Sequence, residues 1–596
     1  MRWPPRRTVR ALSAAAWCAQ FAVLDRLAPS ARSPVVHTLC VLASVALGLA
    51  VLELATSRAR RWAAAIAYAL VYAVQATAVR FYNAPLDRQL VESAVAAASD
   101  VRPVLWQLAP MFAALVTFGA LVEYALLALA SPRTTSLRRA GLALVPLLAL
   151  PFVGLRAATP ELRMVDALRG LVPTARASGH ASITLPLLPT KARALPSVLF
   201  VFGESVRATD FCSAHVDDCP VAPQVNALLP DRVALGTLRS LASYTAISVG
   251  AVFTGRTQLG TAQELAAAPT LFDFARQVRA GNERPHVVYY SAQWSTIFER
   301  ANALEATDRH LDVEDLFGRK IEDSTDIYAE GVDRRLVDRM IADLSTFPTP
   351  QLLTLHLGGT HVPYYMDPAD APFHPYSAVV SWSQLPELHR TYQNAIRAQD
   401  REVARAIHAF IAAQGARPWV VLFTSDHGEA FGEHRAIHHG QNLFDEQIHV
   451  PGFVAWGNGA LSEVQARDLR AHAAAPTSHL DLLPTLLDLY GVYDSVVLEG
   501  HRKELLGSSL LRPAPTAPRA LPISNCSAGY RCPLNTWGML GDSHALIAQA
   551  WDGDYACMPL LANENASAPV VNAECIRLRE ASKRYFERQP NGAPNR

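Results

Sequence analysis

The pattern of hydrophobic and polar positions divides the chain into two unlike parts near residue 160. The first part contains five apolar stretches, which are Ala11–Leu24, Val35–Leu54, Trp62–Val79, Val104–Ala130 and Ala140–Leu155. A helix needs about 20 apolar residues to cross the hydrocarbon core of a bilayer, and the middle three stretches reach that length or nearly so. A signal peptide could account for the first stretch but not for the other four. The pattern therefore predicts a bundle of five transmembrane helices over residues 1–158.

The second part shows a different pattern, in which short β-branched or aromatic runs alternate with helical segments. The runs are Val198–Phe202, Val287–Tyr290, Leu352–Leu357, Val420–Thr424 and Phe453–Ala455, and the clearest helical segments are Thr391–Ala413 and His479–Tyr490. Strands that alternate with helices are typical of a largely parallel sheet covered on both faces. We therefore predict a connector over residues 159–195 and an α/β domain over residues 196–596.

The charges predict how the chain crosses the membrane. The formal net charge is +1, but residues 1–160 contain 16 Arg and 6 acidic residues, so this part carries +10 and the remainder −9. With the N-terminus in the cytoplasm, the inside segments hold 10 Arg against five in the two outside loops. This bias is the positive-inside pattern, and five crossings place everything after about residue 156 on the outer side.

One acidic residue falls inside a predicted span. Glu123 lies in the fourth apolar stretch, where a carboxylate in lipid is costly. Two interpretations are open: a buried Glu123 with a partner or a water-lined site, or an interfacial Glu123 near the end of the span.

Cysteine usage agrees with an outer-side location of the second part. Six cysteines follow residue 200, namely Cys212, Cys219, Cys526, Cys532, Cys557 and Cys575. An even number in an outer-side domain favours disulfides, and proximity suggests the pairs 212–219, 526–532 and 557–575. A zinc cluster is the weaker alternative because no pair has C-x-x-C spacing.

Polar residues with metal-binding chemistry follow three of the predicted strands. Glu204 follows the first strand, His361 the third, and Asp426-His427 the fourth. Ligands in such folds bind at the carboxyl ends of the strands, and carboxylate with imidazole suits Zn²⁺ or Mn²⁺. Taken singly, Glu204 could cap a helix and His361 could be an ordinary loop histidine. Their shared position at strand ends is hard to explain by packing.

The segment 240–250 supplies hydroxyl groups that could act as a nucleophile. Thr245 is the candidate, since a hydroxyl becomes nucleophilic when a metal stabilises its alkoxide. The alternative is a helix N-terminus capped by Ser and Thr. The two interpretations are compatible, because a helix N-terminus also favours phosphate binding.

Four motifs resemble the alkaline phosphatase/sulfatase superfamily. They are Val201-Phe-Gly-Glu204-Ser, Thr245-Ala-Ile-Ser248, Asp426-His427-Gly428-Glu429 and Ser478-His-Leu-Asp-Leu-Leu-Pro-Thr-Leu-Leu-Asp-Leu-Tyr-Gly491. With five N-terminal spans, the chain looks most like the bacterial lipid A phosphoethanolamine transferases. That resemblance implies an inner-membrane anchor and a periplasmic α/β/α sandwich.

The resemblance also implies roles for individual residues. Glu204, Thr245, Asp426 and His427 match zinc ligands, with Thr245 also the nucleophile. His361 matches a histidine that holds the phosphoryl group and assists proton transfer. His439 matches a second substrate or second-zinc histidine, although His438 or His434 could replace it in register. The segment Tyr392–Asp400 resembles the helix behind this site. The implied cofactor is one or two zinc ions, with manganese an alternative.

The implied reaction moves phosphoethanolamine from phosphatidylethanolamine to an outer-side glycolipid such as lipid A through a phospho-threonine, with no nucleic-acid partner. No C/S-x-P-x-R motif follows Thr245, which argues against sulfate-ester hydrolysis. Phosphoglycerol transfer and phosphodiester hydrolysis remain alternatives. A non-catalytic lipid sensor is disfavoured because the four matched metal ligands are all present.

The chain departs from that family at three places. Ser248-Val-Gly-Ala251 stands where the family has Ser-Val-Pro-Cys, no cysteine-rich segment lies near Trp294, and Ser93 replaces a loop asparagine expected after Asp87. These departures predict a divergent member.

Overall fold

A computed structural model describes most of the chain. The described residues are 8, 10–11, 13–16, 34–82, 86, 91, 94–95, 98–132, 134–145, 159–168, 185–190 and 194–590, the last range with gaps at 260–264, 266–267, 295–303, 322–329, 441, 526–535, 550–553, 561–568 and 587–588.

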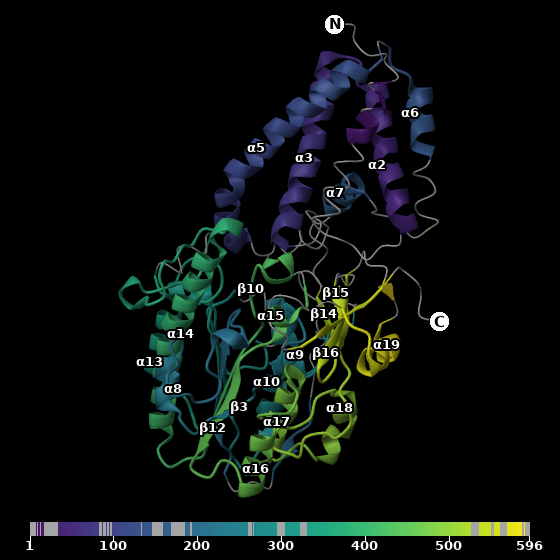
Figure 1. Ribbon diagram of the computed structural model, residues 1–596. Helices are drawn as coiled ribbons and strands as arrows, with labels where there is room; N and C mark the ends of the chain where they lie inside the picture. Colours follow the sequence, from purple (N-terminus) through teal and green to yellow (C-terminus); the bar gives the residue numbers. More distant parts are fainter. Residues whose placement is uncertain are drawn as a thin grey trace.

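The N-terminal helices lie together on one side of the α/β domain (Figure 1). They are α2 (Pro34–Leu54), α3 (Arg58–Tyr82), α5 (Ala98–Ala130), α6 (Leu137–Leu144) and α7 (Pro160–Leu168). Small side chains allow α3 and α5 to approach closely, since a Cβ added at Gly119 would lie 3.2 Å from the Cβ of Ala69. The rings of Trp62 and Tyr124 stack across the same pair of helices, with centroids 4.1 Å apart.

Two described helices are long and apolar enough to cross a bilayer. They span Arg58–Phe81 and Leu105–Ala130, while Thr38–Leu54 is a shorter apolar helix. The first predicted span lies largely outside the described residues, as does the fifth beyond residue 145. The number of five spans therefore stays a prediction. Glu123 is only 2% exposed, so its side chain is buried between helices, as the first of the two interpretations expects.

The central sheet confirms all five predicted strands and adds two short ones. Its order is β3-β12-β9-β2-β8-β6-β7. The strands are β2 (Ser197–Gly203), β3 (Val233–Ala234), β6 (His286–Ser291), β7 (Arg309–Leu311), β8 (Gln351–His356), β9 (Trp419–Ser425) and β12 (Gly452–Gly457). Strands β9, β2, β8, β6 and β7 are parallel, whereas β12 runs antiparallel to β9. The sheet is therefore mixed and mostly parallel.

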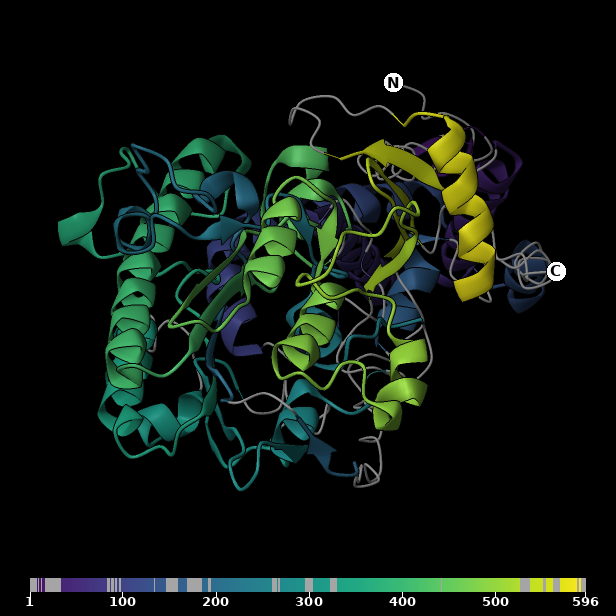
Figure 2. The same cartoon turned by 90° about the horizontal axis from the view of Figure 1, so that it is seen from below.

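Alternating residues of β2 pack into two hydrophobic cores, one on each face of the sheet. Val198, Phe200 and Phe202 pack in the core that includes α9 (Thr245–Thr254), α10 (Leu271–Gln277) and α17 (Leu482–Leu489). Leu199 and Val201 pack in the core that includes α8 (Pro223–Leu228), α13 (Val332–Leu344) and α14 (Leu385–Gln414). The helices thus cover both faces of the sheet (Figure 2). Burial on both sides explains why these strands read as unbroken apolar runs.

A second, antiparallel sheet lies at the C-terminal end of the chain. It consists of β14 (Leu521–Asn525), β15 (Thr536–Leu540), β16 (His544–Gln549) and β17 (Ala556–Pro559), with α19 (Ala573–Tyr585) packed on it (Figure 1). The disulfide Cys557–Cys575 joins β17 to α19, and Cys212–Cys219 closes a loop after β2. Both predicted pairs are confirmed, whereas the 526–532 pair lies outside the described residues.

The ends of α3 and α5 make direct contact with the α/β domain. The indole nitrogen of Trp382 donates to the carbonyl oxygen of Arg80 at 2.8 Å, and the Arg80 guanidinium lies 4.4 Å from the Trp382 ring centre. On α5, the side-chain oxygen of Gln107 accepts from the Val380 amide at 3.0 Å. Phe81 is 5% exposed and belongs to a hydrophobic cluster of the α/β domain.

We expect Phe81→Ala to loosen this junction. Truncation of a buried phenylalanine costs about 3 kcal/mol or more, because it removes contacts and leaves a cavity. Thermal unfolding of the full chain in detergent measures the loss. Phe118→Ala is the matched control, since Phe118 on α5 is 72% exposed. An equal decrease in melting temperature for both variants would show that Phe81 does not hold the junction.

Candidate functional site

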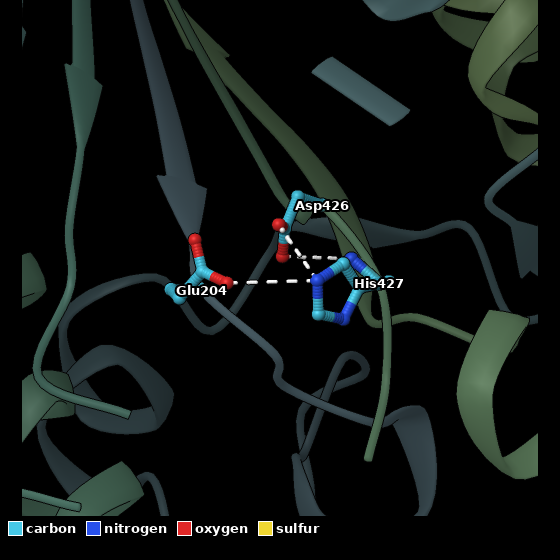
Figure 3. A group of neighbouring side chains, drawn as sticks. All are labelled: Glu204, Asp426 and His427. Atoms are coloured by element: carbon cyan, nitrogen blue, oxygen red, sulfur yellow. Dashed lines mark hydrogen bonds and ion pairs between the residues drawn. The ribbon is translucent and has the colours of Figure 1, made fainter. Parts of the chain in front are cut away.

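Three potential metal ligands come together at the carboxyl ends of adjacent parallel strands (Figure 3). Glu204 directly follows β2, and Asp426 with His427 directly follows β9. All three side chains are fully buried, and their ligand atoms lie within 4.8 Å of one another. The prediction that Glu204, Asp426 and His427 lie close together at the strand ends is therefore confirmed.

The Asp426 carboxylate is fixed by one oxygen only. Its Oδ1 accepts from the backbone amides of Ser205 at 2.8 Å and His427 at 2.7 Å. Its Oδ2 has no hydrogen-bond partner among the described residues and lies 3.2 Å from the Nε2 of His427. A buried carboxylate oxygen without a donor is costly, so this oxygen calls for a cation.

The His427 ring presents its Nε2 to both carboxylates. Its Nδ1 lies 2.9 Å from the carbonyl oxygen of Gly428, so Nδ1 carries the hydrogen and donates it there. Its Nε2, which then bears the lone pair, lies 3.6 Å from the Oε1 of Glu204. Two carboxylates and a neutral imidazole form a donor set that fits Zn²⁺ or Mn²⁺.

The Thr245 hydroxyl lies beside the same cluster. Its Oγ1 donates to the Oε1 of Glu204 at 3.2 Å and lies 3.2 Å from the Nε2 of His427. Thr245 is the first residue of α9, and Tyr244 before it makes no side-chain cap. The alternative of Thr245 as a mere helix cap is therefore wrong, because its hydroxyl points to the ligand cluster.

The two carboxylates differ in acidity. Burial disfavours the charged form of Glu204, but the hydrogen bond from His356 and the nearby histidine rings outweigh burial, so the pKa of Glu204 lies below its usual range. Burial, together with the adjacent Glu204 carboxylate, raises the pKa of Asp426 to about 6. A bound cation would compensate the second negative charge.

Two predicted histidines flank this cluster. The His439 ring centre lies 4.2 Å from that of His427 and 5.4 Å from that of His361. Burial, with these two rings nearby, lowers the pKa of His439, and the Glu429 carboxylate accepts from its Nδ1 at 3.2 Å. His361 donates from Nδ1 to the Val362 carbonyl oxygen at 2.7 Å, so proton exchange with a substrate falls to its Nε2.

The register alternatives to His439 have other contacts. His434 pairs with Glu446 at 3.0 Å and stacks on Phe444. His438 is buried, with its Nδ1 3.4 Å from the Tyr364 hydroxyl. The observed ring contact with His427 favours His439 for the second histidine position.

The sequence interpretation missed two buried residues beside Glu204, and it quoted Glu429 in a motif without giving it a role. His356 and Gln293 approach the Oε2 of Glu204 at 3.2 Å and 3.0 Å, and Glu429 binds His439. His356 is the last residue of β8. A search for polar residues that included the last residue of each strand, and not only the residues after it, would have found His356. Nothing in the sequence singles out Gln293.

The motif Ser478–Gly491 contacts residues that carry the site, through the side chain of His479. His479 lies 3.2 Å from the Thr424 hydroxyl and 3.5 Å from that of Ser248, both through ring nitrogens. The Ser248 hydroxyl in turn donates to the carbonyl oxygen of Asp426. His479 is fully buried, so this part of the motif has a packing role.

Comparison with known proteins assigns the α/β domain. The family model described as Sulfatase matches residues 196–492. The chain contains a sulfatase-family domain. The chain is 32% identical over 149 residues to phosphatidylethanolamine transferase Mcr-2 of Escherichia coli, a match over 24% of this chain and 26% of that protein. It is also 32% identical over 101 residues to the uncharacterized sulfatase YidJ of Escherichia coli, over 17% of this chain and 18% of that protein.

The chain spans about a quarter or less of the length of these curated relatives. A solved structure extends the likeness. Lipooligosaccharide phosphoethanolamine transferase A (EptA) from Neisseria meningitidis, an integral membrane protein, is similar with a TM-score of 0.57 and 16% identity, over 84% of this chain and 98% of that chain. At that identity the match shows a shared fold, and its extent reaches beyond the α/β domain into the N-terminal helices.

We expect the ligand cluster to bind a divalent metal. Added Zn²⁺ or Mn²⁺ should raise the melting temperature of the metal-stripped chain, since a ligand that binds only the folded state stabilises it. The Asp426→Asn variant should not show this rise in melting temperature, because the substitution replaces one carboxylate oxygen, a metal ligand, with an amide NH₂ group. The rise should also shrink from pH 7.5 to pH 5, because protons compete for an acid whose pKa is about 6.

Asp400→Asn is the matched control. Asp400 is equally buried but accepts from the amides of Gln224 and Val225 at the start of α8. A metal-induced rise that survives in Asp426→Asn, or disappears in Asp400→Asn, would contradict the assignment.

Proposed function

We propose that the chain is a membrane-bound, metal-dependent transferase that moves phosphoethanolamine from phosphatidylethanolamine to an outer-side glycolipid such as lipid A. The observation that carries this proposal is the position of the Thr245 hydroxyl, 3.2 Å from both Glu204 and His427 at the start of α9. The sequence similarity to Mcr-2 and the fold shared with EptA support the choice of donor and acceptor.

Glu204, Asp426, His427 and Thr245 would hold the metal ion, for which zinc is the first candidate and manganese the second. Such an ion stabilises a deprotonated hydroxyl and the charge on phosphoryl oxygens. The first-turn amides of α9 add to this, since a helix N-terminus favours anions. The bound ion would thus make the Thr245 hydroxyl easier to deprotonate. The ion and the first-turn amides of α9 would together bind the phosphoryl group beside Thr245.

In the first half-reaction, the Oγ1 of Thr245 attacks the phosphorus of the donor lipid. The Thr245 hydroxyl proton is lost to solvent, a bond from Oγ1 to phosphorus forms, and the bond from phosphorus to the glycerol oxygen breaks. Diacylglycerol leaves with a proton, and we assign the supply of this proton to the Nε2 of His361. The product is phosphoethanolamine esterified to Thr245.

In the second half-reaction, a hydroxyl or phosphate oxygen of the glycolipid attacks the same phosphorus. That oxygen bonds to phosphorus, and its proton, if it carries one, passes to the Nε2 of His361. The bond from phosphorus to Oγ1 breaks, and Oγ1 takes up a proton from solvent, which restores the Thr245 hydroxyl. His439, 5.4 Å from His361 between ring centres, is close enough to help bind the phosphoryl oxygens. The transfer is thus balanced over two displacements.

We further propose that residues 1–158 lie in the bacterial inner membrane and residues 159–195 connect them to a periplasmic catalytic domain over residues 196–596. The Arg-rich inside segments support this orientation, and the Cys212–Cys219 and Cys557–Cys575 disulfides suit an oxidising compartment. The contacts of Phe81 and Arg80 place the α/β domain against the ends of α3 and α5. In this arrangement the catalytic domain would have access to two lipid substrates.

We expect Thr245→Ala to abolish release of diacylglycerol from fluorescent phosphatidylethanolamine by the purified chain with zinc, a loss of about 1,000-fold or more because the nucleophile is removed. Thr254→Ala is the matched control, since Thr254 is a buried threonine at the other end of the same helix, and its hydroxyl donates to the Gly250 carbonyl oxygen and accepts from the Arg256 amide, with no bond to the ligand cluster. Equal product from Thr245→Ala and wild type would rule out the mechanism.

The same assay tests the metal and the donor. Turnover in excess chelator would contradict metal dependence. Release of diacylglycerol from phosphatidylglycerol instead of phosphatidylethanolamine would assign a phosphoglycerol transferase. Mass spectrometry of host glycolipids, with and without the active chain, identifies the acceptor.

A further inference from the structure

Asn525, the last residue of β14, lies between two loops of the candidate site. It is fully buried and belongs to the C-terminal sheet, far along the chain from the nucleophile. One loop contains Ser243, two residues before Thr245, and the other contains Gly440, directly after His439. No part of the mechanism above uses Asn525.

The amide of Asn525 binds both loops at once. Its Oδ1 accepts from the Ser243 amide at 2.9 Å, and its Nδ2 donates to the Ser243 hydroxyl at 2.8 Å. The same Nδ2 lies 3.3 Å from the carbonyl oxygen of Gly440 and 3.2 Å from that of Asn442. A primary amide carries two donor hydrogens, and three oxygens lie within hydrogen-bond distance of Nδ2, so both hydrogens of Asn525 have an acceptor here.

Ser243 completes the connection. Its hydroxyl donates to the carbonyl oxygen of Asn442 at 2.5 Å and accepts from the Gly440 amide at 3.2 Å. The backbones on either side of the site are therefore joined through two buried polar side chains, both shielded from water. Buried networks of this kind hold their members in one arrangement, because every broken bond leaves an unsatisfied group.

The neighbouring strand strengthens the same link. Gln549, at the end of β16, donates from its Nε2 to the side-chain oxygen of Asn442 at 2.6 Å. The C-terminal sheet thus presents the ends of two strands to the loops that carry Thr245 and His439.

We propose that Asn525 is a positioning residue that fixes the distance between the Thr245 nucleophile and the His439 side of the substrate site. This inference rests on the proposed transferase function. A displacement of about 1 Å between reacting groups can cost about 100-fold in rate, so a residue that only orients others can control turnover.

The test compares Asn525→Ala and Asn525→Asp with Ser524→Ala in the full-length chain. Ser524 is the adjacent buried residue, and its hydroxyl donates to the Gln258 carbonyl oxygen without touching either loop. We expect kcat for diacylglycerol release to fall about 10- to 100-fold in both Asn525 variants, with little change in KM for the lipid. Ser524→Ala should lower the melting temperature similarly but keep its kcat.

Asn525→Asp keeps the shape and the acceptor of asparagine but replaces its donors with a carboxylate oxygen facing two carbonyl oxygens. It therefore tests the hydrogen bonds even if Asn525→Ala folds poorly. A double-mutant cycle with Ser243→Ala adds a second measurement: the losses should be strongly non-additive, because both residues act through one network.

The outcomes separate this inference from the proposed function. An active wild type with unchanged kcat in folded Asn525→Asp, or additive losses in the cycle, overturns the positioning role alone. A kcat that falls equally in Ser524→Ala and the Asn525 variants also overturns it. An inactive wild type overturns the transferase proposal itself.

Discussion

Two carboxylates of like charge, both removed from water, are the constraint around which the site is built. Glu204 and Asp426 lie at the ends of adjacent strands and are both fully buried. Their negative charges therefore repel each other without screening by solvent. The protein compensates Glu204 with His356 and Gln293, whereas one oxygen of Asp426 has no donor among the described residues. This unequal compensation fits the binding of a cation, and a bound cation would stabilise the deprotonated form of the Thr245 hydroxyl.

The rest of the fold serves to hold this arrangement. Parallel pairing of β2 with β9 sets the spacing of the two carboxylates, and α9 brings Thr245 to them by its first residue. The C-terminal sheet joins the loop before Thr245 to the loop after His439 through Asn525. The contacts of Arg80 and Phe81 attach the same domain to the N-terminal helices.

Local patterns in the sequence were sufficient for the strands and for most of the site. The apolar runs of the central sheet are buried on both faces, so their hydrophobicity marks them clearly, and the residues after them identify Glu204, Asp426 and His427. Distant pairings left no such mark: Asn525 meets Ser243 across 282 positions of the chain, and the antiparallel C-terminal sheet escaped prediction. The choice among His434, His438 and His439 depended on backbone geometry that spacing does not encode.

The central claim is that phosphoethanolamine rests on Thr245 between two displacements. The most direct measurement is mass spectrometry of tryptic peptide 240–256 after the zinc-loaded chain is incubated with phosphatidylethanolamine, without acceptor, and quenched in acid. The account predicts a phosphoethanolamine adduct on Thr245 that disappears when glycolipid is added. Release of diacylglycerol with an unmodified Thr245, or an adduct on another residue of that peptide, would contradict it.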